Sequence, residues 1–351
     1  MSHRTCLILH GSENRDLGGP SIRVPKTVSF LRDRGQDVEL LHLHRQAMEL
    51  ERFGMAHVFN VWPLRSCRTT LRFARWLGLK TVLSPILLDY SRSPNHQARN
   101  GFHGPYPLAE LAEIFRLADH IIYLSAVERD HAAQLGLPLR PHSIIHNPVD
   151  ASLFTPGDGQ QFRATFESQT GRPAPERFAL SVGRIEPRKN QLALIKSLAS
   201  SECPLVLIGH EADVEYSEAC HAAAGKNVHF LGRLPHQRDV LASAYQAAST
   251  FAQVSWSEGG SLAALEAAAS GCRLVLSDLP SNREYFGHHP SYVALDNHAA
   301  IRKAVLSQVA APREDGTLRE IVASEFGYQR HVAALSAVYR RLLAPTVAVA
   351  A

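Results

Sequence analysis

Two glutamates eight residues apart, Glu258 and Glu266, flank a turn that opens a helix. The segment from Trp256 to Asp278 reads WSEGGSLAALEAAASGCRLVLSD, and its helix is made almost entirely of alanine and leucine. Such a helix should be buried on every side. Glu266 is its only charge, and a buried carboxylate is costly unless a hydrogen-bond donor satisfies it. A pair of ligand hydroxyls is one such donor, and an internal arginine is the alternative.

The turn before this helix has the features of an anion site. Gly259 and Gly260 allow a ligand to approach the backbone closely, and the Ser261 hydroxyl can cap the helix. The unpaired N–H groups of a helix N-terminus attract negative charge. We expect the helix to end at Gly271, which is suited to the position just after the last helical residue.

A second motif, FALSVGRIEPRKNQ, covers Phe178 to Gln191. Its apolar strand runs into Gly183 and Arg184. Pro187 and Asn190 then favour the start of another helix. The motif therefore predicts a strand, a glycine turn and a helix in succession.

Two cations, Arg188 and Lys189, fall at the start of that predicted helix. The positive end of a helix dipole disfavours cations by about 0.3–1 kcal/mol, so their placement suggests that an anion lies between them. A diphosphate suits this pair because arginine forms forked hydrogen bonds and lysine supplies a point charge. An exposed basic turn that only aids solubility is the alternative.

Together these motifs resemble the donor-binding half of the retaining, GT-B fold glycosyltransferases of family 4, also called glycosyl transferases group 1. GRIEPRKNQ is followed about 70 residues later by SEGGSLAALEAAASGC. Three further segments resemble the family's interdomain segment, a strand with its Gly-Arg turn, and the closing helix: SIIHNPVDASLF (143–154), NVHFLGRL (227–234) and FGYQRHVAALSAVYRRLL (326–343). The resemblance implies an α/β protein with two Rossmann-like parallel-sheet domains facing a cleft and a C-terminal helix that crosses back to the N-terminal domain.

The resemblance also implies roles for individual residues. As catalytic residues, Arg188 and Lys189 would hold the diphosphate and Glu258 the sugar hydroxyls, while Glu266 would bind the ribose hydroxyls. Further donor contacts are implied for turn glycines, their neighbouring arginines and the capping serine, namely Gly18, Gly19, Gly183, Arg184, Gly232, Arg233, Gly259, Gly260 and Ser261.

The acceptor side departs from the family pattern. Many members have a histidine just after the fourth strand of the first domain, but Ser84, Pro85 and Ile86 stand there, with His96 and His103 further along. A lone histidine in a loop is more often a solvated surface group than a catalytic one. A subunit that binds nucleotide sugar without catalysing transfer is therefore one alternative.

The expected reaction moves a sugar from a nucleotide sugar to a hydroxyl acceptor, in cell-surface polysaccharide or glycolipid assembly. The favoured donor is a UDP-sugar, and a GDP-sugar is the second choice. The acceptor is a sugar, a lipid-linked sugar or a small molecule. The nucleotide sugar is a substrate, so no cofactor is expected. No pair of carboxylates is placed as nucleophile and acid. The resemblance suggests instead a retaining front-face displacement, in which the leaving phosphate helps to deprotonate the acceptor. A nucleotide-sugar epimerase on the same fold is the other alternative.

Other enzyme classes lack their motifs. The chain has no GxGxxG of a dinucleotide dehydrogenase and no GxxxxGK[ST] of a P-loop hydrolase. It also has no Asp-x-Asp pair, and the histidine pairs at 42 and 44 and at 288 and 289 have no evident third ligand, so a metal-independent enzyme is expected.

Composition suits a soluble chain of two domains. The 351 residues are 45% hydrophobic and 20% charged, and the net charge of +4 is too mild to indicate nucleic-acid binding. Five cysteines without a CxxC pair suggest reduced thiols. With no recognisable signal peptide or membrane-spanning run, we expect a cytoplasmic protein, either free or at the inner face of the membrane.

Strands and helices alternate along the chain, which predicts parallel sheets. We expect an acceptor-binding domain over residues 1–165, completed by the closing helix at 326–345, and a donor-binding domain over 170–325. The first sheet should contain strands at 5–10, 37–43, 56–61, 81–84, 120–125 and 143–146. The second should contain strands near Phe178, Leu205, Val228, at 249–255, at 273–277 and near Tyr292.

Four arginines recur at three- and four-residue steps in PLRSCRTTLRFARWLGLK: Arg65, Arg68, Arg72 and Arg75. This spacing puts them in one stripe of a helix, beside an apolar stripe. Such a stripe suits an anionic membrane surface or a lipid-diphosphate acceptor. A solvated helix face is the alternative.

Overall fold

The structure is a computed structural model, and it describes residues 4–9, 19–42, 47–91, 107–234, 238–313 and 316–344. Contacts within the chain divide it into two compact units. Unit 1 contains Met1–Leu88, Pro105–Pro148 and Tyr328–Ala351, and unit 2 contains Asp89–Gly104 and Val149–Gly327. Each unit is described by itself.

Unit 1 is built on six parallel strands in the order β2-β1-β3-β4-β5-β6. Their bounds are β1 (Thr5–Leu9), β2 (Val38–His42), β3 (Met55–Phe59), β4 (Lys80–Ser84), β5 (His120–Tyr123) and β6 (His142–Ile144). Among its described residues, the helices are α1 (Gly19–Asp33), η1 (Ala47–Arg52), α3 (Leu64–Trp76), α5 (Leu108–Leu117), α6 (Ala126–Gln134) and α15 (Tyr328–Leu343).

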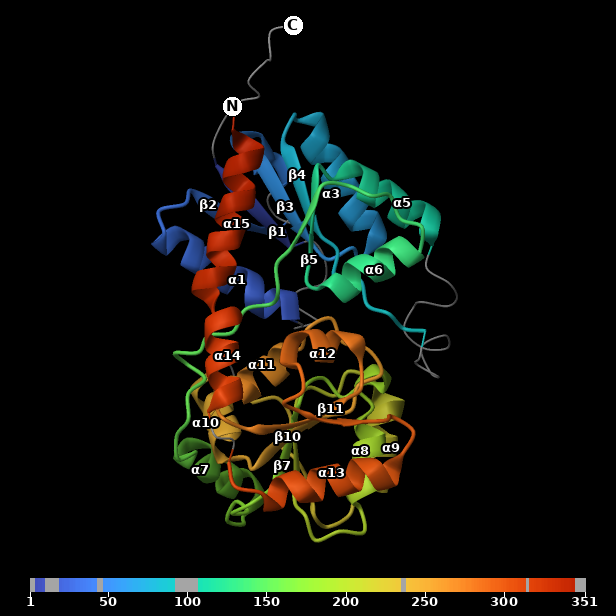
Figure 1. The fold of residues 1–351 in the computed structure, drawn as a ribbon, viewed down its shortest axis with the longest axis vertical. Coiled ribbons are helices and arrows are strands. Elements are labelled where there is room, and N and C mark those ends of the chain that lie inside the picture. The colour runs from blue at the N-terminus through green and yellow to red at the C-terminus, as the bar shows by residue number, and fades with distance from the viewer. Residues whose placement is uncertain are drawn as a thin grey trace, which may run out of the picture. The chain divides into compact units, whose positions relative to one another are not determined.

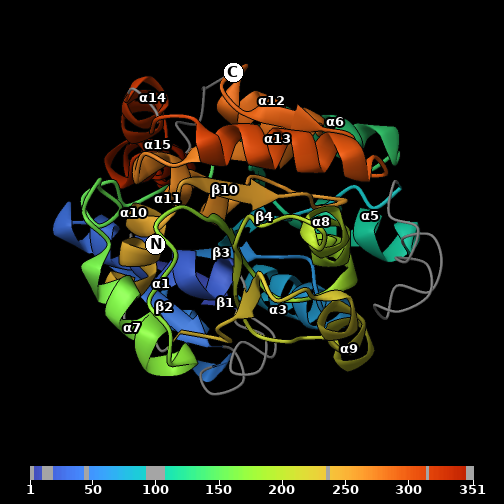
Figure 2. The same cartoon turned by 90° about the horizontal axis from the view of Figure 1, so that it is seen from below.

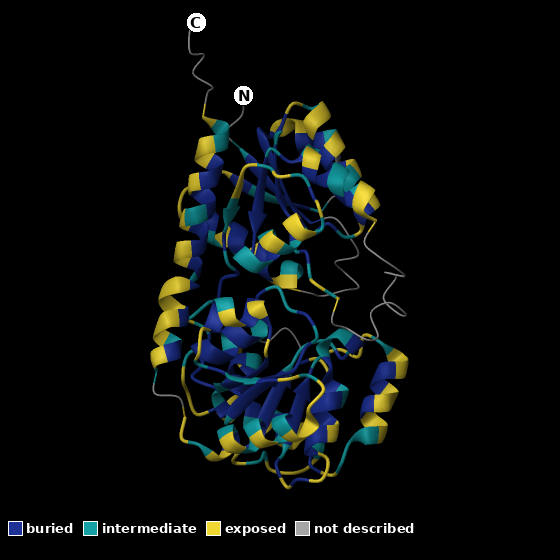
Figure 3. Ribbon diagram, turned by 45° about the vertical axis from the view of Figure 1, so that its right-hand side comes forward, coloured by how far each residue is buried: buried dark blue, intermediate teal, exposed yellow. Residues whose placement is uncertain are grey.

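The central strands of unit 1 are buried on both faces, as expected of a parallel sheet. Apolar side chains of α3, α5 and α6 form the core on one face, and those of α1 and α15 form the core on the other. Figure 3 shows the result, with dark blue strands inside and yellow on the outer faces of the helices and on loops. The closing helix α15 thus belongs to the core of unit 1.

Unit 2 also has six parallel strands, in the order β12-β11-β10-β7-β8-β9. Their bounds are β7 (Ala179–Val182), β8 (Leu205–Ile208), β9 (Val228–Phe230), β10 (Thr250–Gln253), β11 (Arg273–Ser277) and β12 (Ser291–Val293). The helices are α7 (Gln160–Thr170), η2 (Pro187–Lys189), α8 (Gln191–Leu198), α9 (Val214–Ala223), α10 (Arg238–Ala247), α11 (Leu262–Ala269), α12 (Pro280–Phe286), α13 (His298–Ala310) and α14 (Thr317–Glu325).

Helices cover both faces of this second sheet (Figure 1). One core is formed with α7, α10, α11, α12 and α14, and the other with α8, α9 and α13. The helices α8 and α9 lie side by side in Figure 1 and again in Figure 2. The strand order reverses between β7 and β10, and the carboxyl ends of strands at such a switch point are where open α/β sheets bind ligands.

The predicted α/β fold with two parallel sheets is confirmed, and every predicted strand is present within a few residues. The predicted helix start at Pro187 is wrong in detail. Pro187–Lys189 form a single 3-10 turn, and the α-helix begins only at Gln191. Asn190 between them has a left-handed backbone with φ 55°, which interrupts the helix, and its side chain makes no capping bond.

Candidate active site

Two loops meet at the switch point of the unit 2 sheet. One follows β7 and contains η2, and the other follows β10 and precedes α11. The strands are neighbours, with Phe251 opposite Leu180. Beyond the strands, the Trp256 backbone N–H donates to the Arg188 carbonyl at 2.9 Å, and the Arg188 Nη1 donates to the Ser257 carbonyl at 2.9 Å. Arg188 therefore ties the two loops together through both its backbone and its side chain.

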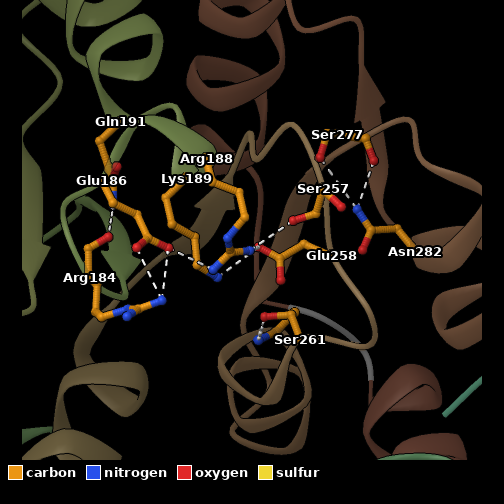
Figure 4. Close-up of polar contacts among 11 residues, drawn as sticks. Arg184, Glu186, Arg188, Lys189, Gln191, Ser257, Glu258, Ser261, Ser277 and Asn282 are labelled. Carbon is orange, nitrogen blue, oxygen red and sulfur yellow. Dashed lines mark hydrogen bonds and ion pairs between the residues drawn. The ribbon is translucent and has the colours of Figure 1, made fainter. Parts of the chain in front are cut away.

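These loops bring five charged side chains into one group, the charged cluster: Arg184, Glu186, Arg188, Lys189 and Glu258. The Lys189 Nζ lies 2.7 Å from the Glu258 Oε1, and the Arg188 Nη1 lies 3.4 Å from the same oxygen. Glu186 accepts from Arg188 at 2.7 Å and pairs with Arg184 at 3.1 Å (Figure 4). Three cations thus face two carboxylates, so the cluster carries one net positive charge.

Burial makes this cluster electrostatically strong. The side chains of Arg188, Lys189 and Glu258 are only 11%, 14% and 6% exposed. Burial opposes the charge on Arg188, but Glu258 and Glu186 outweigh it and raise the pKa of the guanidinium. Burial alone would raise the pKa of Glu258, yet Lys189 and Arg188 hold it below its usual value, so this carboxyl is ionised at neutral pH. Burial lowers the pKa of Lys189 despite its contact with Glu258.

The glycines of these loops allow close backbone approach. Gly183 follows β7 with φ 150°, and Lys189 lies over it, since a Cβ there would be 3.6 Å from the Lys189 Cε. Gly209, which follows β8, has φ 159°, and a Cβ there would be 1.8 Å from the Gly183 carbonyl oxygen. Only glycine therefore lets these two strand ends touch.

The helix α11 begins and ends as its sequence predicts. The Ser261 hydroxyl accepts from the Ala264 N–H at 3.2 Å, and Gly271 follows the helix with φ 77°. Gly260, one residue before the cap, has φ 98° and packs against the Tyr285 ring. Glu266 is half-buried on this helix and accepts a hydrogen bond from the Tyr245 hydroxyl at 3.1 Å.

The other residues predicted to contact the nucleotide-sugar donor lie outside these two loops. Gly232 and Arg233 follow β9 and are exposed, and the Gly232 carbonyl accepts from the Gly209 N–H at 2.8 Å. Gly19 is the first residue of α1 in unit 1, also exposed. Gly18 lies outside the described residues, as do His96 and His103.

At the end of β4, where family members often have a histidine, Ser84 is buried and contacts a histidine from another strand. The Ser84 Oγ lies 2.9 Å from the Nε2 of His57, whose Nδ1 lies 2.7 Å from the Tyr339 hydroxyl. Burial lowers the pKa of His57 well below its usual value. His57 is therefore a neutral, fully buried link between β3, β4 and α15.

The arginine stripe of α3 is largely paired within unit 1. Arg68 lies 3.5 Å from both Glu110 and Glu113, Arg72 pairs with Glu113, and Arg75 lies 3.1 Å from Asp119. These partners favour the solvated-face alternative for three of the four arginines. Within the described part of the chain, no helix is both long enough and apolar enough to cross a membrane.

Three residues around the site were not predicted: Glu186, Gly209 and Tyr245. Glu186 stands between two apolar residues in the motif, a placement that signals a buried charge in need of a partner. Gly209 ends an apolar strand, as Gly183 does, and that repeated position was the available signal. Tyr245 has no local signal, because an aromatic residue on an amphipathic helix usually belongs to the core.

The class of protein follows from the fold and from sequence comparison. The chain is similar in structure to sucrose-phosphate synthase from Thermosynechococcus elongatus, with a TM-score of 0.78, 19% identity and coverage of 97% of this chain and 99% of that one. HepE from Anabaena, solved with UDP-glucose, gives a TM-score of 0.72 at 14% identity over 95% of this chain and 99% of that one. The fold is therefore that of the GT-B glycosyltransferases.

Residues 162–315 match the family described as glycosyl transferases group 1. A curated relative, the D-inositol 3-phosphate glycosyltransferase of Mycolicibacterium smegmatis, is 28% identical over 238 residues, which cover 64% of this chain and 54% of that protein. The corresponding enzyme of Catenulispora acidiphila is 26% identical over 76% of this chain and 68% of its own length. The chain spans about half the length of the first of these relatives.

Proposed function

We propose that this chain is a retaining family 4 glycosyltransferase that moves a sugar from a UDP-sugar to a hydroxyl acceptor. The observation that carries the proposal is the charged cluster. It gathers three cations and Glu258 at the switch point of a sheet, inside a glycosyl transferases group 1 domain. We propose that the reaction takes place in the cytoplasm, in polysaccharide or glycolipid assembly.

The comparisons support the choice of substrate class. HepE was solved with UDP-glucose, and the curated relatives are named for transfer to an inositol phosphate. We therefore put UDP-sugars first as donors, followed by GDP-sugars. The acceptor is a hydroxyl of a sugar, a lipid-linked sugar or a small molecule.

The paired state of the cluster suits it to receive a diphosphate. Lys189 and Arg188 both contact Oε1 of Glu258. An arriving diphosphate would provide new acceptors for Lys189 and Arg184, while Arg188 keeps its bond to the Ser257 carbonyl. Glu258 would then turn a carboxylate oxygen toward the sugar hydroxyls. Fixed cations in a buried site stabilise the negative charge that develops on a leaving diphosphate.

In the proposed step, the bond from the anomeric carbon to the diphosphate oxygen breaks as the acceptor oxygen bonds to the same face of that carbon. The acceptor proton passes to a phosphate oxygen of the leaving group. The anomeric configuration is therefore retained, with no enzyme nucleophile and no metal ion. Product made from an α-linked donor should be α-linked by NMR, and its rate should not fall with EDTA. A β-linked product, or a sugar bound covalently to a side chain, would rule out this step.

Donor binding is tested by thermal unfolding with UDP, GDP and ADP. A nucleotide at about 100 times its dissociation constant should stabilise the protein by about 2.7 kcal/mol. Lys189→Ala should remove that stabilisation, because it removes a buried cation of the cluster. Arg68→Ser on α3 should leave it unchanged, because Arg68 belongs to unit 1 and pairs with Glu110 and Glu113. A chain that responds to none of the three nucleotides would contradict the proposal.

Turnover distinguishes the transferase from the alternatives. An epimerase would convert the donor without an acceptor, and a non-catalytic subunit would bind the donor without consuming it. We expect UDP release from UDP-glucose to depend on an added acceptor.

A further inference from the structure

The Tyr245 hydroxyl is the partner that α10 provides for the carboxylate of Glu266. Tyr245 donates to the Oε2 of Glu266 at 3.1 Å, from α10 to α11. A carboxylate has about four acceptor positions, and the bond from Tyr245 occupies one of them. Glu266 is also half-exposed, whereas five of the seven other residues of α11 are buried. The bond therefore orients a carboxylate that is only partly buried.

Packing fixes the Tyr245 ring in place. The side chain is fully buried, with the Phe154 ring 5.8 Å away edge-on and the Phe251 ring 5.9 Å away. Its backbone carbonyl accepts from the Cys272 thiol at 2.9 Å. The next residue, Gln246, donates to the Thr155 carbonyl at 2.9 Å. The ring and backbone of Tyr245 are thus held by β10, by the residue just before β11 and by the 154–155 segment.

Tyr245 is also restricted to the role of a donor toward Glu266. Burial, and then the neighbouring charge of Glu266, raise the pKa of the phenol well above its usual value. The phenol therefore stays protonated at neutral pH. A neutral hydroxyl that faces a carboxylate can only donate to it.

We infer that Tyr245 is a positioning residue that orients Glu266 for the ribose hydroxyls of the donor. The inference rests on the proposed function, in which Glu266 contacts the ribose. A binding group works when its rotamer is locked by packing and by a supporting hydrogen bond, and Tyr245 supplies both. Tyr245 itself touches no ligand in this account, so removing its hydroxyl should alter only the recognition that Glu266 performs.

The test measures ribose discrimination by calorimetry, using UDP, GDP and ADP with their 2′-deoxy counterparts. A hydrogen bond to a charged group is worth about 10-fold or more in affinity, so the wild-type protein should bind the ribonucleotide at least about 10-fold more tightly than the deoxynucleotide. Tyr245→Phe should reduce that preference to about 3-fold or less, while affinity for the deoxynucleotide stays within about 2-fold of wild type. The double variant Tyr245→Phe, Glu266→Gln should keep the same ribose preference as Glu266→Gln alone, because Tyr245 acts only through Glu266.

Tyr292→Phe is the matched control. The Tyr292 hydroxyl is in the same unit and donates to the Gly287 carbonyl at 2.7 Å. This variant should keep the full ribose preference. Equal losses for ribo- and deoxynucleotide in Tyr245→Phe would show a merely structural role, and an unchanged preference would show that Glu266 needs no such support. Either result overturns the inference but leaves the proposed function intact, whereas a wild-type protein that binds no nucleotide contradicts the proposed function itself.

Discussion

At Gly260, in the loop before α11, the neighbouring atoms leave no room for a side chain. Gly260 has φ 98°, and a Cβ placed on it would be 2.4 Å from both Cζ and the hydroxyl of Tyr285. Tyr285 is itself buried, and its ring stacks on Phe326 at 5.1 Å, so it has nowhere to move. The backbone next to Glu258 is thus shaped by a glycine in contact with an aromatic ring.

We predict that Gly260→Ala lowers the free energy of unfolding by about 2–4 kcal/mol, because it adds a steric clash to an unfavourable backbone conformation. Gly271→Ala at the other end of α11 is the matched control. Its φ is 77°, but a Cβ there would meet only Pro156, at an ordinary 3.7 Å. We expect a loss of about 1–2 kcal/mol there from the backbone alone. Urea denaturation measures both, and equal losses would show that Tyr285 yields to the added methyl group.

Some residues of the candidate site can be recognised from the sequence alone, and others cannot. Glu258, Glu266 and the glycines stand out because a charge inside an apolar run, or a glycine at a strand end, is unusual. The internal partners of Arg188 and Lys189 do not stand out, because Glu258 meets them from about 70 residues away along the chain. Tyr245 is hidden for the same reason, since its partner lies 21 residues further on. Local spacing identifies candidates, while pairing across the sheet depends on the fold.

Strands and helices were more predictable than the turns that join them. Parallel strands buried on both faces appear as short apolar runs, and such runs mark the inner strands of both sheets, such as β1, β8 and β10. The exception is the helix break before α8. It comes from the left-handed backbone of Asn190, which the hydrophobic periodicity of the sequence does not indicate. In unit 1 a similar exception follows β4, where Ile86 has φ 54°, an outlier for a β-branched residue.

Glu128 of α6 stabilises that unusual turn after β4. One carboxylate oxygen accepts from the Leu87 N–H at 2.7 Å and the other from the Leu124 N–H at 2.6 Å. The side chain therefore joins the loops that follow β4 and β5. Burial raises the pKa of Glu128 to about 7, although these two bonds and the charge of Arg23 oppose the shift.

A pKa raised in the folded state makes stability depend on pH in a definite direction. Glu128 stabilises the fold fully below its ordinary pKa, and that contribution is lost as the pH rises through about 7. We predict that wild type loses up to about 3 kcal/mol relative to Glu128→Gln between pH 4.5 and pH 8. The variant carries a constant cost because an amide oxygen replaces only one of the two acceptors. Urea denaturation across this range measures the difference, and parallel curves would show that Glu128 has an ordinary pKa.

For the molecule as a whole, charge is the feature most easily misread from sequence. The chain carries a net charge of +4, and four arginines line α3, which together suggest attraction to anionic lipid. The structure places carboxylates of α5 and of the turn after it beside three of those arginines. Figure 1 shows α3 and α5 next to each other in unit 1. Paired opposite charges produce a weaker field at a distance, and salt screens the remainder.

We predict that Arg68→Ser with Arg72→Ser leaves co-sedimentation with anionic vesicles unchanged at physiological salt. The stability of the chain should change by less than about 1 kcal/mol, because exposed ion pairs contribute little. Glu113→Gln is the informative companion, since it removes the acid that Arg68 and Arg72 share. If the carboxylates mask a lipid-binding face, this variant should bind vesicles more strongly than wild type. Loss of vesicle binding in the double serine variant would instead show that the arginines reach lipid despite their partners, and would restore the membrane contact that the helical spacing suggests.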